Sequence, residues 1–372
     1  MILVLGFWLI IGFLVSKKTK IERPPLFFPI LVWLGLGFLS ILTNWAFANL
    51  ALDRGFFYFL KEFQFFIFYL YVFWGIKKID TAKLLVNAWL LFASVNVLYV
   101  IYQMVSGFRK GEYGTAAIGE RGVFPTGAFF LLLFIFLFSV FLFYTLRLNI
   151  SIFKKASLGI LAFSPVLGVF GSASRTNFAG LIFALFLIFL LFFLREINLK
   201  TILVFILAIV LITLMFSFAF KNVVDASRLK EMVSGFSLGS LWESYKRARL
   251  DTAILPRLRA SLESSAHLPF LGMGKGYVGE AHNQYLRNFI ELGLIQSLVF
   301  LILIFAIIRM SWQGFSKGGD GLAVGLSAGL LVATLTLLFI SFATEPFIVV
   351  KPSSVYWFFA GITMAVLSLN KK

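Results

Sequence analysis

Long apolar stretches alternate with short polar segments along most of the chain. Each stretch is close to the roughly 20 residues that an α-helix needs to cross the hydrocarbon core of a bilayer. They cover about residues 2–16, 26–48, 54–76, 83–105, 126–147, 154–172, 176–195, 200–220, 287–309, 321–343 and 353–369. The first is followed by basic residues rather than by a small-residue cleavage site, so we expect a span there and not a cleaved signal peptide. The pattern predicts an all-α, polytopic bundle of about 11–12 transmembrane helices.

The composition excludes several classes of protein. Hydrophobic residues make up 60% of the sequence and charged residues 13%, which is too apolar for a water-soluble core. The lack of cysteine excludes disulfides and thiolate metal sites. Two histidines, His267 and His282, are too few for a multi-histidine metal centre. We attribute the net charge of +17 to membrane topology and expect no nucleic-acid binding.

The distribution of lysine and arginine predicts which loops face the cytoplasm. Alternate short loops are rich in basic residues, and the positive-inside rule assigns that set to the cytoplasm. The longer loops, about residues 106–125 and 221–286, are then expected on the outer side together with the N-terminus, and the C-terminus is expected in the cytoplasm. The chain therefore divides into eight transmembrane helices in 1–220, an extramembrane helical loop subdomain in 221–286, and C-terminal transmembrane helices in 287–372.

The loop subdomain contains a helical stretch at 241–262. Aromatic and aliphatic residues interleave there with basic ones, among them Arg257 and Arg259, and Pro256 is expected to break or kink the helix. Two interpretations fit this composition. The helix lies on the membrane surface among anionic headgroups, or it helps to grip a substrate.

The stretch from Leu271 to Gln296 carries the strongest candidate chemistry. Residues 274–279 match the pattern GxGxxG, but no strand precedes them and no βαβ unit fits between transmembrane spans, which excludes a dinucleotide site. The glycines can instead form an anion-binding nest, to which Lys275 adds a charge. A plain tight turn before a helix is the competing interpretation.

His282 and Asn283 stand at the predicted start of the span 287–309. The positive end of the helix dipole disfavours an imidazolium there, so we expect a neutral imidazole near pH 7. That is the form which a general base requires. Asn283 is suited to cap the helix or to bond to its neighbour. The competing interpretation is a structural histidine whose hydrogen bonds are satisfied within the fold.

Two arginines lie where spans begin on the predicted outer side. Arg175 ends the polar segment GSASR, whose small residues permit close helix packing, and Arg121 lies in the segment GERGVFP before another span. Each of them could simply snorkel to lipid headgroups. Guanidinium groups also recognise phosphate in a bidentate manner, so two arginines from different helices would clamp a diphosphate. The sequence holds no DxD pair for a divalent metal, which favours a lipid-linked donor whose charge is balanced by arginines.

These segments resemble the O-antigen ligase and O-antigen polymerase superfamily of bacterial envelopes. The resemblance rests on His282 and Asn283 followed by nine residues and Gly293, on PFLGMG at 269–274, on SASR at 172–175 and on RGVF at 121–124. Gln296 stands where ligases commonly have a second glycine, which keeps the polymerase as an alternative.

The resemblance implies an inverting, metal-independent transferase of the C-type glycosyltransferase kind. It implies a place in the inner membrane, an active site that faces the periplasm, and no cofactor. A ligase would transfer a glycan from undecaprenyl diphosphate to lipid A–core, whereas a polymerase would join two lipid-linked repeats.

On the same analogy the site residues have separate roles. Arg121 and Arg175 bind the donor diphosphate and His282 is the catalytic residue, assisted by one basic residue of the loop, Arg257 or Arg259. From the residues themselves, Asn283 and Lys275 are further candidates for a supporting role. A transporter for lipid-linked sugars, from a different class, would also be polytopic and rich in arginine. It should show paired helices interrupted by glycine or proline, and no such pair stands out in the sequence.

Overall fold

The apolar runs fold as helices because a helix satisfies its backbone hydrogen bonds within its own segment, as a bilayer core requires. The computed structural model describes residues 23–48, 52–107, 115–120, 122–195, 199–223, 255–256, 259, 268–277 and 282–371. The helices are α2 (Phe27–Ala48), α3 (Leu52–Gly75), α4 (Ile79–Ser106), α5 (Val123–Phe143), η1 (Thr145–Arg147), α6 (Ile152–Phe163), α7 (Pro165–Gly171), α8 (Arg175–Arg195), α9 (Leu199–Val223), α13 (Leu268–Leu271), α14 (Gln284–Lys317), α15 (Gly321–Ile340) and α16 (Val350–Leu369).

Within the described residues, nine segments are long and apolar enough to cross a membrane. They are α2, α3, α4, α5 with η1, α6 with α7, α8, α14, α15 and α16. The predicted all-α, polytopic membrane bundle is therefore confirmed. The predicted span 200–220 corresponds to α9, whose apolar stretch Ile206–Ala219 is shorter, and the predicted span 2–16 lies outside the described residues.

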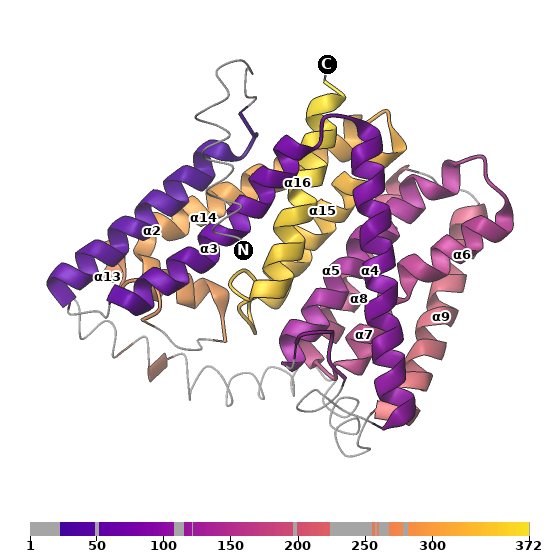
Figure 1. The fold of residues 1–372 in the computed structure, drawn as a ribbon, viewed down its shortest axis with the longest axis horizontal. Coiled ribbons are helices and arrows are strands. Elements are labelled where there is room, and N and C mark those ends of the chain that lie inside the picture. The colour runs from indigo at the N-terminus through magenta and orange to yellow at the C-terminus, as the bar shows by residue number, and fades with distance from the viewer. Residues whose placement is uncertain are drawn as a thin grey trace.

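Helices α5 and α15 form the centre of the bundle. The most apolar stretch of each is 83% buried, as expected for helices that are hydrophobic on all sides. They approach closely at Gly325, where an added Cβ would lie 2.9 Å from the Cα of Val140. In Figure 1, α15 and α16 lie between the pair α2 and α3 and the group that runs from α4 to α9.

The peripheral helices present apolar side chains to the surroundings. On α4, for example, Leu98 is 65% exposed and Val105 is 71% exposed. In water such a surface would be costly, whereas lipid chains are as apolar as leucine. The exposed apolar face is what a membrane-embedded bundle requires.

The bundle has a basic end and an opposite end, which we call the outer end. At the basic end, the guanidinium of Arg195 donates to the backbone carbonyls of Phe315 and Gly318. The outer end holds the starts of α3, α5, α8, α14 and α16. Two of these starts are joined directly, because Asn177 Nδ2 donates to the carbonyl of Phe124 at 3.0 Å. The positive-inside rule predicts that the basic end is cytoplasmic.

The predicted extramembrane segment 221–286 overlaps the last residues of α9, which ends at Val223, and the first residues of α14, which begins at Gln284. Most of the predicted helix 241–262, including Arg257, lies outside the described residues, whereas Leu255, Pro256 and Arg259 are helical and exposed.

Helix α14 differs from the predicted continuous span 287–309. It runs from Gln284 to Lys317 and is interrupted at Gly293, whose φ of 68° and ψ of −175° are not helical. That region of conformational space is essentially restricted to glycine. The sequence pattern does not reveal the interruption because a single glycine within an apolar run is also compatible with a continuous helix.

Candidate functional site

A glycine-rich segment, Leu268 to Tyr277, folds back into the outer half of the bundle. Where α14 is interrupted, its carbonyls lose their helical partners, and the segment supplies new ones. Met273 N–H donates to the carbonyl of Ile290 at 2.7 Å, and Gly274 N–H donates to the carbonyl of Glu291 at 2.9 Å. We call residues 272–277 the glycine loop.

Polar side chains of α2 complete the binding of the glycine loop. Ser40 Oγ donates to the carbonyls of Leu271 and Glu291 at 3.3 and 3.4 Å, and Asn44 Nδ2 donates to the carbonyl of Gly272 at 3.2 Å. A loop within the membrane is tolerated only where protein groups satisfy its backbone. The contacts with α2 and α14 meet that condition.

Alanine at Gly293 should destabilise the fold. Its added Cβ would lie 2.4 Å from the carbonyl oxygen of Phe270 and 2.5 Å from the amide nitrogen of Gly272, and its backbone would hold a conformation that costs about 1–3 kcal/mol for a residue with a side chain. We expect a lower unfolding midpoint in detergent. Gly35→Ala in α2, with nothing within 4 Å of the added Cβ, is the control. If the two variants unfold at the same midpoint, the close contact between Gly293 and residues 270–272 does not contribute to stability as we expect.

Lys275 points from the glycine loop into the bundle. Its side chain is 1% exposed and its ammonium group forms an ion pair with Glu62 of α3. Trp33 Nε1 donates to the same carboxylate at 3.0 Å, and Lys275 Nζ lies 5.2 Å from the centroid of the Trp33 ring. Gly37 makes room for the lysine, since a Cβ there would lie 2.5 Å from Lys275 Cε. The supporting role of Lys275 in donor binding stays a prediction, and its charge is already balanced by Glu62.

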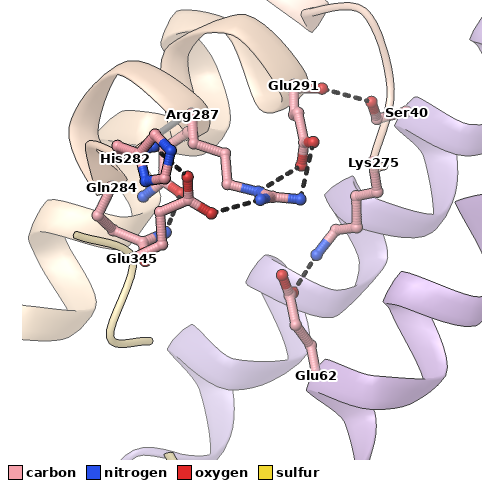
Figure 2. A network of polar contacts seen from close by, with 9 residues as sticks. Ser40, Glu62, Lys275, His282, Gln284, Arg287, Glu291 and Glu345 are labelled. Carbon is pink, nitrogen blue, oxygen red and sulfur yellow. Dashed lines mark hydrogen bonds and ion pairs between the residues drawn. The ribbon is translucent and has the colours of Figure 1, made fainter. Parts of the chain in front are cut away.

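Arg287, one turn into α14, is bound by two carboxylates (Figure 2). Its Nη2 lies 3.0 Å from Glu291 Oε1 and its Nε lies 3.2 Å from Glu291 Oε2, while its Nη1 lies 2.5 Å from Glu345 Oε2. The guanidinium also lies 5.2 Å from the centroid of the Tyr58 ring. Two-sided recognition of this kind fixes a guanidinium firmly.

The buried charges of this region balance one another. The cations Lys275 and Arg287 face the carboxylates of Glu62, Glu291 and Glu345. Lys61 adds a third cation at the edge of the group, with its Nζ 5.6 Å from the centroid of the Tyr58 ring. Ionisable residues within membranes usually pair in this way. The group therefore fits a scaffold better than an anion-binding site.

His282 lies beside this scaffold, directly before α14. It is half-buried, its φ is 54°, and its backbone N–H donates to Glu345 Oε1 at 2.6 Å. Asn283 is the N-cap of α14, since its Oδ1 accepts from Leu286 N–H at 2.9 Å, and its Nδ2 donates to the carbonyl of Phe342 at 3.0 Å. The predicted cap is confirmed, and it fixes the residue that follows His282.

Arg175 is the first residue of α8 and is exposed. Its helix packs against the end of α15, where an added Cβ on Gly180 would lie 2.9 Å from the side chain of Ile340. The next residue of the chain, Ser341, accepts the N–H of Gln284 at 3.0 Å. Arg175 and His282 thus lie at the same end of the bundle, on elements that the end of α15 connects.

Arg121 lies outside the described residues, although Gly122, which follows it, is the N-cap of α5. That start of α5 is joined to α8 through Asn177. Near the same segment, Lys351 at the start of α16 donates to the carbonyl of Ile118 at 2.5 Å. In the described part of the chain, no three histidine or acidic side chains gather closely enough to hold a metal ion.

Sequence reasoning missed Glu62, Arg287 and Glu345 as parts of this region. A signal exists for Glu62 and Arg287, because charged residues inside predicted apolar spans are candidates for function or for pairing. Glu345 lies between two spans and has no such signal. Except for Glu291, which lies four residues after Arg287, their partners are distant in sequence, as the pair Lys275 and Glu62 illustrates with a separation of 213 residues.

The outer end therefore combines an imidazole at a helix start, a charge-balanced scaffold beside that imidazole, and an exposed guanidinium at the start of α8. An imidazole can accept a proton from a hydroxyl group, and a guanidinium can stabilise a phosphate as it leaves. Comparison with known proteins adds no family: no model of a protein family matches the chain, and no curated protein matches it.

Proposed function

We propose that the protein is an O-antigen ligase, which transfers a glycan from undecaprenyl diphosphate to lipid A–core. The observation that carries the proposal is the occurrence of His282 and Arg175 at one end of a membrane bundle. A lipid-linked donor presents its diphosphate and sugar at the membrane boundary, where both side chains lie. The reaction would take place on the periplasmic side of the bacterial inner membrane.

Each residue has a defined role in the proposed reaction. His282 accepts the proton of an acceptor hydroxyl, and the hydroxyl oxygen attacks the anomeric carbon of the donor glycan. The bond between that carbon and the phosphate oxygen breaks, and undecaprenyl diphosphate leaves with the bonding electron pair. Arg121 and Arg175 stabilise the negative charge on the leaving group without a metal. Attack from the face opposite the diphosphate inverts the anomeric centre.

Arg175→Ala should lower kcat/KM for the donor more than kcat/KM for the acceptor. Loss of the guanidinium removes a charge-assisted contact to the diphosphate, and such contacts contribute about 1.5–3 kcal/mol, so we expect kcat/KM for the donor to fall about tenfold or more. Arg175→Lys should restore part of it, because lysine keeps the charge but not the bidentate geometry. Arg147→Ala, at the basic end, is the control. An unchanged kcat/KM for Arg175→Ala would remove this residue from the site.

Two alternatives use the same outer end. An O-antigen polymerase would accept a second lipid-linked repeat in place of lipid A–core. The interruption of α14 at Gly293 favours a transporter of lipid-linked sugars as a candidate from another class, since transporters bind their substrates where helices are discontinuous.

Reconstitution of the purified protein separates the three. Liposomes that contain an undecaprenyl-diphosphate glycan receive lipid A–core, a second glycan donor, or neither. Glycan on lipid A–core supports the ligase, and lengthened lipid-linked chains support the polymerase. Movement of the donor between leaflets without a covalent product supports the transporter and contradicts both transferases.

A further inference from the structure

One carboxylate from the turn after α15 reaches the backbone of His282. Glu345 Oε1 accepts the N–H of His282 at 2.6 Å, and Glu345 Oε2 accepts Nη1 of Arg287 at 2.5 Å. Figure 2 shows the two oxygens bound to different groups, one to His282, two residues before α14, and one to Arg287 in its first turn. Both oxygens of one carboxylate are thereby used for positioning.

His282 needs such a contact because of its backbone conformation. Its φ of 54° lies in the left-handed region, which is uncommon for residues other than glycine and persists only where neighbouring groups hold it. The direction of the imidazole follows from that conformation. A change in φ would turn the side chain away from its present direction.

Glu345 is itself fixed by its surroundings. The N–H of Gln284 donates to the carbonyls of Ser341 and Thr344 at 3.0 and 3.1 Å, and the N–H of Phe347 donates to Gln284 Oε1 at 3.3 Å. These bonds attach the turn that carries Glu345 to the start of α14. Glu345 is also 9% exposed, so water competes little for its carboxylate.

We propose that Glu345 is a positioning residue for His282. It acts through the backbone N–H of His282 and not on the substrate, and Arg287 holds its second oxygen. This inference rests on the proposed function of His282 as the general base. Its expected consequence is an effect on the chemical step without an effect on substrate binding.

Glu345→Ala and Glu345→Gln test the positioning in the transfer reaction. Because small misplacement of a catalytic group costs on the order of a hundredfold in rate, we expect kcat to fall by about that factor in Glu345→Ala, with KM for donor and acceptor unchanged. Glu345→Gln keeps an oxygen that can accept the N–H of His282, so its loss should be smaller. Added to a His282→Asn variant, Glu345→Ala should change the residual rate no further. Asp53→Asn, an exposed carboxylate at the outer end, is the control.

A second readout does not depend on activity. The chain has two histidines, so histidine-labelled protein in detergent gives two imidazole signals in an NMR spectrum, which a His267→Asn variant assigns. The His282 signal should shift or broaden in Glu345→Ala while the His267 signal stays.

The outcomes separate this inference from the proposed function. An unchanged His282 signal in Glu345→Ala overturns the inference, and so does a kcat equal to that of the unmodified protein. If the unmodified protein transfers no glycan, the proposed function is contradicted instead. The NMR measurement is then the one test of whether Glu345 positions His282.

Discussion

Asparagine in place of His282 should lower the rate of glycan transfer by about a hundred- to ten-thousandfold, the usual contribution of a general base. The protein should remain folded, because asparagine tolerates the left-handed conformation that His282 adopts. Its side-chain amide cannot accept the proton of an acceptor hydroxyl at neutral pH. The measurement is kcat in the reconstituted reaction, together with the unfolding midpoint of each variant.

His267→Asn supplies the matched control for this prediction, because His267 is the other histidine of the chain. It should leave kcat unchanged. If a folded His282→Asn variant keeps full activity, the imidazole takes no part in the mechanism. His282 is then a structural residue whose hydrogen bonds are satisfied within the fold.

Neutralising one member of the ion pair between Lys275 and Glu62 should destabilise the protein strongly. Lys275→Met leaves the Glu62 carboxylate without its cation in a buried place, and breaking a buried pair in this way costs about 3–5 kcal/mol. Glu62→Gln leaves the ammonium in the same position. The combination of the two removes both charges, so it should be more stable than either single variant.

Unfolding midpoints of the single and double variants in detergent measure this coupling. The pair Lys83 and Asp80 at the basic end is the control, because it is exposed and exposed pairs contribute little. If both single variants unfold at the midpoint of the unmodified protein, the ion pair does not hold the glycine loop.

Hydrophobic length was sufficient to predict most of the fold. The span 54–76 was predicted although Lys61 and Glu62 lie within it, and α3 covers that region. An apolar run long enough to span a bilayer has few alternatives to a helix, because its backbone groups must be hydrogen-bonded without water. Asn283 is predicted to cap the helix or to bond to its neighbour, and the structure shows the cap.

The interior of the site could not be predicted in the same way. Gly293 interrupts α14 because the glycine loop approaches it within van der Waals distance, and that approach depends on a segment well before it in sequence. The inward direction of Lys275 depends on the carboxylate of Glu62, and the hold on His282 depends on Glu345. Such pairings follow from the packing of distant helices and have no local signature.

The most direct test counts the products of the reaction. Purified protein in liposomes, supplied with an undecaprenyl-diphosphate glycan and lipid A–core, should release one undecaprenyl diphosphate for each glycosidic bond formed, with inversion at the anomeric carbon. The same preparation with His282→Asn should release about a hundredfold less or lower still. Intact donor after prolonged incubation with a folded, unmodified protein and either acceptor would contradict glycan transfer at this site.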